Sequence, residues 1–426
     1  MPSPLPTLPK TPKDRFEVHR LFNGLSEEGK EGLDHGRLRV PLVKTFLLEH
    51  VSARNGGKSK PLAEIWERLH GEPTQVDDAF FSVQGVVKEP ESGQPKKVTV
   101  GYVEQYHERF FAYYTVEDSV SAKRRVSSWV TGSPDLDFAW FSSPFLKALW
   151  DQDVSHRGDQ RFTKMAFRHD SIFELPEDAT SETGEDAGDE RPVGESEAEE
   201  RFEPERRKVR SEMGDCIGRL RESLENLQRS YSPLHALYAL RIPSQSSRGG
   251  HDVFQHGQLT NRSDSFEDHR NTARYLYRIY NSVLESTEDA AWGEVNSNGT
   301  QSVGWKGTPL IVRFGEPLSP STFEHWISRA FQKRNVFKLW GEPLRLGPTK
   351  VHVYGADRHI WQPLNLEITE SQLVAILPQG TCGNTFHRLV ANLQRYVAPE
   401  IEAWIGAKRF NAFVEMKDFR SEDHAS

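Results

Sequence analysis

Residues 174–205 have the sequence ELPEDATSETGEDAGDERPVGESEAEERFEPE, and this stretch decides the expected organisation of the chain. It holds 14 acidic residues against two arginines, a net charge of −12, and it has only three large apolar side chains. Such a segment buries too little apolar surface to offset the entropy of ordering itself. We therefore predict an acidic disordered linker over 174–205 that joins two α+β domains, at residues 13–173 and 206–412.

The charge of this linker also changes how the rest of the chain is interpreted. The whole chain carries −8, so removing the −12 of the linker leaves +4 for the remainder. Blocks of like charge are usually solvated tethers, and that is the simpler interpretation here. The alternative is an internal mimic of nucleic acid that competes for a basic surface.

The composition of the 426 residues excludes several classes of protein. The 10 Trp, 24 Phe and 11 Tyr argue against wholesale disorder, and nothing indicates a collagen, a coiled-coil rod or a disulfide-stapled mini-protein. Residues 1–12 lack the pattern of a signal peptide, and no window approaches the ~20 apolar residues of a membrane span. With only Cys216 and Cys382, we expect a cytoplasmic protein without a membrane partner.

The N-terminal domain is expected to combine helices with an antiparallel meander. Apolar spacing predicts helices over 37–51, 61–69 and 119–130, and β-branched and aromatic runs predict strands over 80–87, 98–106, 110–116 and 161–168. A winged helix-turn-helix is the alternative, with 61–69 as its recognition helix. Glu64 and Glu67 on that helix would oppose contact with phosphates, which favours an ordinary packed α+β domain.

The C-terminal domain is expected to open with an amphipathic helix over 206–230. A Ser-, Arg- and Gly-rich loop follows residue 242, and a long helix is predicted over 268–286. Beyond it, strands are predicted over 309–314, 336–340, 350–354, 364–369, 372–377 and 401–405, with helices over 319–334 and 384–397. This order indicates helices on one face of a largely antiparallel sheet.

The densest polar tract is 241–278, which combines arginines, histidines and Gly249-Gly250. Arginines four residues apart on a helix lie near one face, and guanidinium groups match phosphate oxygens. We therefore predict a surface that binds phosphate, nucleotide or nucleic acid, formed by Arg248, His251, Arg262, Arg270, Arg274 and Arg278. The alternative is a solvated helix face, ion-paired with Asp264, Glu267 and Asp268.

The same tract contains three histidines, His251, His256 and His269, beside Asp252. Their spacing matches no zinc motif, because there is neither a Cys-x-x-Cys pair nor a His-Glu-x-x-His helix. We therefore expect these histidines to form hydrogen bonds and predict neither a metal nor a cofactor.

A second candidate site is LPQGTCGNTFHRLV at 377–390, where a strand enters a Gly-containing loop and a helix begins. Cys382 and Arg388 have a spacing that is similar to the Cys-x5-Arg loop of cysteine-dependent phosphatases, which implies a thiolate nucleophile and a phosphate-holding arginine. Thr381, Thr385 and Leu389 depart from that family's usual residues. The alternative is a structural turn with a buried cysteine.

No nucleotide-binding, kinase or serine-hydrolase motif occurs in the sequence. The aromatic tracts and arginines favour interaction, since these residues are the usual anchors of interfaces. We predict a non-catalytic binding or scaffold subunit of a cytoplasmic bacterial assembly, with other protein subunits as partners and nucleic acid or nucleotide as a further ligand. One setting that we consider for this assembly is a bacterial defence or conflict system. The alternative is a phosphoester-acting enzyme that uses Cys382 and Arg388.

Overall fold

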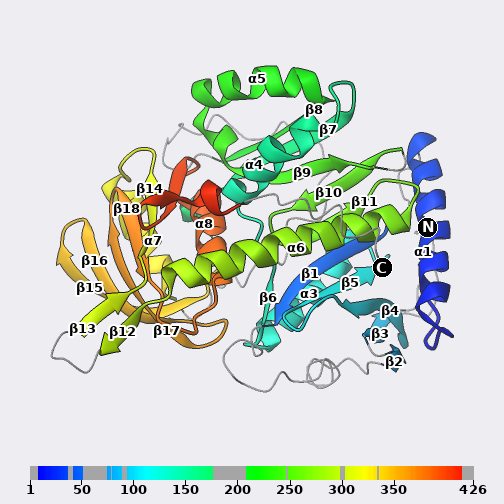
Figure 1. The fold of residues 1–426 in the computed structure, drawn as a ribbon, viewed down its shortest axis with the longest axis horizontal. Helices are drawn as coiled ribbons and strands as arrows, with labels where there is room; N and C mark the ends of the chain where they lie inside the picture. The colour runs from blue at the N-terminus through cyan, green and yellow to red at the C-terminus, as the bar shows by residue number, and fades with distance from the viewer. Residues whose placement is uncertain are drawn as a thin grey trace.

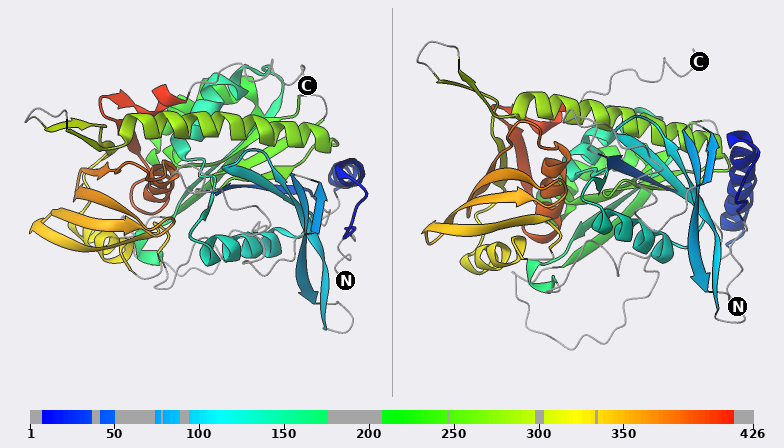
Figure 2. Two further views of the ribbon diagram at one scale, coloured as in Figure 1. Left: turned by 60° about the horizontal axis from the view of Figure 1, so that its bottom comes forward. Right: turned by 90° about the horizontal axis from the view of Figure 1, so that it is seen from below.

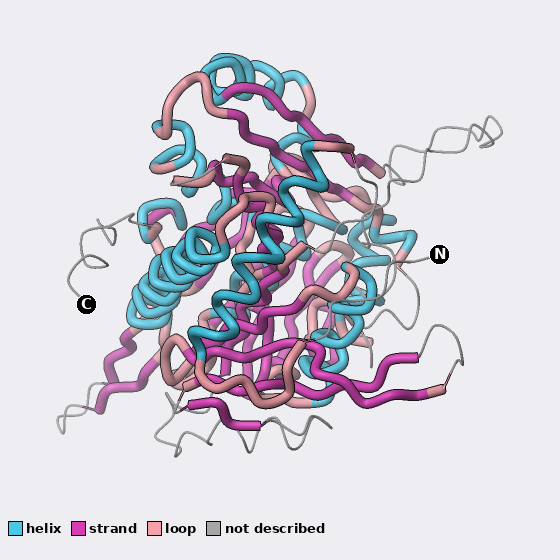
Figure 3. Tube along the Cα trace, turned by 90° about the vertical axis from the view of Figure 1, so that its right-hand side faces the viewer, coloured by secondary structure: helices cyan, strands magenta, loops and turns pink. Residues whose placement is uncertain are grey.

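Two antiparallel sheets with helices packed against them form the protein, so the predicted α+β class is confirmed. The computed structural model describes residues 8–36, 42–50, 74–77, 79–88, 94–175, 208–245, 248–297, 303–332 and 335–414. Many strands run through the middle of the view with helices beside them, and strand hairpins extend outward (Figure 3).

The first sheet has 11 strands among the described residues, all paired antiparallel. Its order is β2-β3-β4-β5-β1-β11-β10-β9-β7-β8, with β6 paired to β1 off this path. The strands are β1 (Lys44–His50), β2 (Thr74–Asp77), β3 (Phe80–Lys88), β4 (Pro95–Gln105), β5 (Phe110–Thr115), β6 (Leu136–Phe138), β7 (Phe162–His169), β8 (Val209–Cys216), β9 (Leu237–Pro243), β10 (Gly250–Phe254) and β11 (Gln258–Asn261).

This sheet includes strands from both sides of the acidic segment. β7 pairs with β8 over eight residues, and β1 in the middle of the sheet pairs with β11. The predicted boundary at 174–205 therefore cuts through one sheet, so residues 13–173 and 206–412 are not separate folding units. Residues 176–207 lie outside the described residues, and with them most of the segment predicted to be disordered.

The second sheet is built from the C-terminal third of the chain, as predicted. It has seven described strands in the order β15-β16-β17-β18-β14-β19-β20, and a separate hairpin, β12 with β13, extends away from it (Figure 2). The elements are β12 (Glu294–Ser297), β13 (Val303–Lys306), β14 (Leu310–Phe314), β15 (Leu339–Gly347), β16 (Lys350–Asp357), β17 (Gln362–Thr369), β18 (Gln372–Ile376), β19 (Ile401–Ile405) and β20 (Lys408–Arg409).

The helix predicted over 37–51 is wrong where the structure describes it, because residues 44–50 form strand β1. All seven residues of β1 are buried. Phe46 and Leu48 pack into the core on one side of the sheet and Leu47 into the core on the other. A strand covered on both faces has a continuous apolar run, which short-range periodicity does not distinguish from a buried helix.

The predicted helix over 206–230 is confirmed only in its second half. Residues 209–216 form β8, an edge strand in which the first six residues alternate between half-buried and exposed, and helix α5 begins only at Ile217. The tract after residue 242, expected as a loop, forms the hairpin of β10 and β11. The helix predicted over 61–69, and with it the winged-helix alternative, lies outside the described residues.

Helices cover both faces of the first sheet. The side with Phe46 and Leu48 packs on α3, while α1, α4 and α6 contribute to the larger core on the other side. That larger core continues without a break into the inner face of the second sheet. The helices are α1 (Arg15–Asp34), α3 (Ser119–Gly132), α4 (Ser143–Gln152), α5 (Ile217–Ser230), α6 (Phe266–Ala291), α7 (Pro320–Ala330) and α8 (Asn384–Tyr396).

Helix α6 crosses the molecule from α1 to the second sheet (Figure 1). It begins where the Ser265 side chain accepts a hydrogen bond from the Asp268 N–H, and it extends the predicted helix over 268–286 at both ends. Its apolar residues Leu276, Ile279 and Val283 are buried. No helix among the described residues is long and apolar enough to cross a membrane.

Helix α8 lies between the two sheets, and every one of its residues from Asn384 to Tyr396 is buried. A helix that is enclosed all round must satisfy its polar side chains internally. Asn384 does so by donating to the Phe138 carbonyl at 2.8 Å, and Asn392 donates to the Val336 carbonyl at 3.0 Å. These two bonds join α8 to β6 of the first sheet and to the segment just before β15 of the second.

The continuous first sheet generates a prediction about cleavage. If a protease site is inserted within 176–207 and cut, the two fragments should stay associated, because β7–β8 and β1–β11 pairing joins them. Size-exclusion chromatography should show one peak with the mass of the uncut chain, and two peaks only in denaturant. If the two fragments eluted separately, each with native secondary structure, the predicted division into two domains at 174–205 would be supported.

Candidate functional site

Arg270 and Arg274, the centre of the predicted phosphate surface, both bind a carboxylate of the protein itself. The Arg270 Nε lies 2.9 Å from the Glu104 carboxylate and the Arg274 Nη2 lies 3.1 Å from it. Glu104, on β4, is only 1% exposed. Burial opposes ionisation of this carboxyl, but the Arg270 guanidinium keeps its pKa below the usual value. These arginines neutralise a buried charge.

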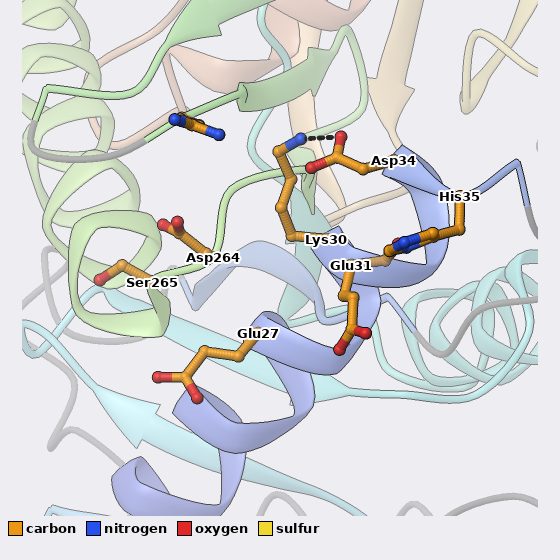
Figure 4. A pocket seen from close by; sticks show the side chains of 8 residues that line it. Glu27, Lys30, Glu31, Asp34, His35, Asp264 and Ser265 are labelled. Carbon is orange, nitrogen blue, oxygen red and sulfur yellow. Dashed lines mark hydrogen bonds and ion pairs between the residues drawn. The ribbon is translucent and has the colours of Figure 1, made fainter.

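The other members of the tract are also arranged around acidic groups. The Arg262 Nε lies 3.0 Å from Asp252, which also accepts two hydrogen bonds from Arg241. Arg248 lines an open hollow of about 930 Å³ between the end of α1 and the start of α6. Figure 4 shows the acidic residues of this hollow and the ion pair of Lys30 with Asp34. Its lining residues are Glu27, Lys30, Glu31, Asp34, His35, Arg248, Asp264 and Ser265.

His251 lies in the interior and is fully buried. Its Nε2 lies 2.9 Å from an Asp268 carboxylate oxygen, and its Nδ1 lies 3.2 Å from the Nδ1 of His269. His269 in turn contacts the Thr45 hydroxyl at 2.8 Å. Arg278 is half-buried on α6. The predicted phosphate-binding surface therefore loses most of its geometric support, since Arg262, Arg270 and Arg274 pair with carboxylates of the protein and His251 lies in the core, while Arg248 stays exposed.

Cys382, the predicted nucleophile, lies directly before α8 and is 1% exposed. Its Sγ lies 3.2 and 3.3 Å from the two oxygens of Glu49. Burial, reinforced by the Glu49 carboxylate, raises the pKa of the Cys382 thiol well above its usual value. An activated thiolate requires the opposite shift and an accessible sulfur, so the enclosed Cys382 gives no support to the predicted phosphatase nucleophile.

Arg388, predicted to hold a phosphate beside Cys382, instead binds two carboxylates of the protein. Its guanidinium is fully buried and forms ion pairs with Asp137 of β6 and Asp357 of β16. Its Nε also donates to the Phe337 carbonyl at 3.2 Å. The Cys-x5-Arg spacing therefore places the two residues in neighbouring but separate polar clusters.

A different arginine, Arg109, contacts the cysteine. It precedes β5, is 4% exposed, and its Nη2 lies 3.4 Å from the Cys382 Sγ. The same guanidinium donates to Glu49 at 2.5 Å and to Glu288 at 2.6 Å. Glu288, near the end of α6, also accepts the Gly383 N–H at 2.8 Å. Two buried carboxylates thus share one guanidinium around the thiol.

His359, in the turn between β16 and β17, completes this interior cluster. It is 1% exposed, and within the described residues neither of its ring nitrogens has a hydrogen-bond partner. Burial lowers the pKa of His359 below its usual value. Donor atoms of His359, Glu49 and Cys382 all lie within 4.8 Å of one another, which is a set that could hold a metal ion.

Sequence reasoning missed Glu49, Arg109 and His359. Glu49 carried a usable signal, because it is a carboxylate inside the apolar run TFLLE of residues 45–49. A charge inside a buried strand needs a partner or a role. His359 and Arg109 gave no such signal, since each stands in a polar turn sequence next to a strand.

The outer face of the second sheet is a separate candidate site. Aromatic and aliphatic side chains that point away from the core are exposed there, including Trp340, Leu344, Tyr354 and Ile376. Pairing registers place Tyr354 beside Asn365, and Asn365 beside Ile376. Trp340 and Leu344 pair with Ala356 and His352, which share one face of β16 with Tyr354. All four residues therefore lie on one surface, which we call the outer face.

Comparison with known proteins assigns the chain to a family. Residues 25–411 match the family described as MJECL33-like protein. The chain belongs to the MJECL33-like family. The match extends from α1 to beyond β20, so both sheets and the cluster of Glu49, His359 and Cys382 lie within the region that defines the family.

One relative of this MJECL33-like chain is the uncharacterized protein MJECL33 of Methanocaldococcus jannaschii. The two are 25% identical over 144 residues. That alignment covers 34% of each chain, so it spans about a third of the relative's length. No solved structure matches the chain.

The buried pair of Arg270 and Glu104 predicts a large effect on stability. Replacing Glu104 with Gln leaves a mostly buried guanidinium without its charge partner, so the free energy of unfolding in urea should fall by about 3–5 kcal/mol. The matched control is Glu324→Gln, which breaks the exposed pair with Arg345 and should cost at most about 1 kcal/mol.

The same variant has a predictable pH dependence. The folded protein lowers the pKa of Glu104. The ion pair therefore stabilises the fold fully at a pH above the pKa that Glu104 has in the unfolded chain, and this stabilisation is lost as the pH falls through the lower pKa of the folded state. The difference between wild type and Glu104→Gln should therefore shrink under acid conditions. If Glu104→Gln and Glu324→Gln lowered the free energy of unfolding equally at neutral pH, Glu104 would not act as the buried partner of Arg270.

The burial of Cys382 predicts the thiol chemistry of the folded protein. A disulfide reagent such as DTNB should modify the half-buried Cys216 first and leave Cys382 unmodified until urea unfolds the chain. A Cys216→Ser variant should then show almost no reaction in its native state. If Cys382 reacted rapidly in the native state of that variant, its thiolate would be accessible and the predicted nucleophile would again be supported.

Proposed function

We propose that this member of the MJECL33-like family is a non-catalytic binding subunit of a cytoplasmic multi-protein assembly, and that it docks a protein partner through the outer face of its second sheet. The observation that carries the proposal is the exposure of large apolar side chains on that face. Trp340 is 56% exposed, Leu344 64% and Tyr354 75%. Clustered exposed apolar groups of this kind mark interaction sites.

The chemistry of the outer face favours a protein over a nucleic acid. Trp and Tyr are enriched at interface hot spots, where they fill apolar pockets. The basic groups on this face, Lys350 and His352, both pair with Glu367, at 2.9 and 2.6 Å. A phosphate backbone requires a continuous basic surface, and this face instead combines apolar groups with paired charges.

The interior chemistry supports the non-catalytic part of the proposal. The buried, high-pKa thiol of Cys382 and the ion-paired Arg388 are unsuited to attack on a phosphoester, so the enzyme alternative has no support from this site. Neither Cys216 nor Cys382 is part of a disulfide, which favours a reducing compartment such as the cytoplasm.

The proposal predicts that single substitutions on the outer face weaken partner binding. Proteins retained by the tagged full chain from its native host should be identified, purified and titrated against the chain as a binary complex. Trp340→Ser and Tyr354→Ser should each raise the dissociation constant about 30-fold or more, which is a loss of about 2 kcal/mol in binding free energy.

A matched control separates the outer face from exposed aromatics in general. Phe16 is 69% exposed on α1, at the opposite end of the molecule (Figure 1), and Phe16→Ser should leave the affinity unchanged. Circular dichroism should show all three variants folded. A partner that binds Trp340→Ser and Tyr354→Ser as tightly as the wild type would overturn the proposal.

A further inference from the structure

We propose that Glu49, His359 and Cys382 bind one divalent transition-metal ion, Zn²⁺ in the first place, and that this ion joins the two sheets. The three residues come from β1 in the first sheet, the β16–β17 turn of the second, and the loop before α8. An ion held by all three therefore links the three parts of the fold that meet at the interior cluster. This site is independent of the proposed docking surface.

The donor types determine the class of metal. Thiolate sulfur, imidazole nitrogen and carboxylate oxygen are all ligands of Zn²⁺, whereas Ca²⁺ and Mg²⁺ prefer oxygen alone. Bond lengths of about 2.0–2.3 Å and tetrahedral angles separate ligand atoms by roughly 3.5 Å. The Cys382 Sγ already lies 3.2 Å from a Glu49 oxygen, and the three donor atoms lie within 4.8 Å of one another.

The buried imidazole of His359 gives independent support. A neutral imidazole offers one donor and one acceptor, and burying both without partners costs several kcal/mol. Within the described residues both of its ring nitrogens lack a hydrogen-bond partner, although Glu49 and Cys382 lie nearby. A metal ion bound to the nitrogen that faces these two residues would satisfy its lone pair.

Charge balance points to the same conclusion. Arg109 is shared by Glu49 and Glu288, so one guanidinium faces two carboxylates around the thiol. The adjoining cluster balances by itself, because Arg388 and Lys338 face Asp137 and Asp357. A divalent cation bound to a Cys382 thiolate adds a net charge of +1 beside these two carboxylates.

The binding step is an exchange of a proton for a metal. The Cys382 S–H bond breaks, its proton passes to solvent, and the sulfur lone pair binds the ion, with no change in oxidation state. Glu49 and a neutral His359 nitrogen bind through their own lone pairs. Arg109, which donates to Glu49 at 2.5 Å, acts as a positioning residue that holds the carboxylate toward the sulfur.

The test uses the full chain produced in medium supplied with zinc or cobalt. Elemental analysis should find about one metal per chain after exhaustive dialysis, as expected for a buried three-residue site. The cobalt form should show a thiolate-to-cobalt charge-transfer band and visible bands of tetrahedral Co²⁺. Added zinc should raise the unfolding temperature of the metal-free chain, because it binds only the folded state.

Variants assign the site. Cys382→Ser should abolish the charge-transfer band, and His359→Gln should reduce metal retention to background. Matched controls are Cys216→Ser and His325→Gln, which lie outside the cluster and should bind metal like the wild type. Unfolding of each variant in EDTA, compared with the metal-free wild type, separates lost binding from lost folding. A chain that retains neither metal, or binding that persists in both cluster variants, would overturn the proposal.

Discussion

The ion pairs of Arg388 with Asp137 and Asp357 are the interaction on which the arrangement of the two sheets depends. All three side chains are fully buried, and they come from α8, β6 and β16. Removing three charges from water is costly, and the cost is recovered only when every partner is held in place. The two sheets can therefore shift relative to α8 only by exposing an unpaired charge to the apolar core.

The surroundings of this triad follow from the same requirement. Lys338 donates to Asp137 at 2.8 Å and has a φ of 52°, a left-handed backbone conformation that is uncommon outside glycine. Trp140 and Thr385 also donate to the two aspartates. The uncommon backbone conformation of Lys338 is strained, and the ion pair of its side chain with Asp137 offsets this cost.

The inner and outer faces of the second sheet show how one element serves two roles. Its inner residues, such as Val351, Val353 and Leu366, join the same core as the first sheet. Its outer residues alternate with them and leave Trp340 and Tyr354 exposed. The arginine tract has no comparable exposed chemistry, because Arg270 and Arg274 are used to neutralise Glu104.

The amino-acid sequence alone determined the elements that local patterns define. These are the α+β class, the helices α6 and α8, and strands such as β14, β16 and β17, because periodicity acts over a few residues. Only the tertiary structure decided that residues 44–50 form a strand, since burial on both faces removes the alternation that identifies one.

Tertiary structure also decided which charged groups meet. Glu49 and Cys382 are 333 positions apart in the chain, and Arg270 and Glu104 are 166 apart. The sequence supplies the residue types at these positions but not their neighbours. Their neighbours depend on long-range strand pairing, and the energy of a buried charge depends on those neighbours more than on its own type.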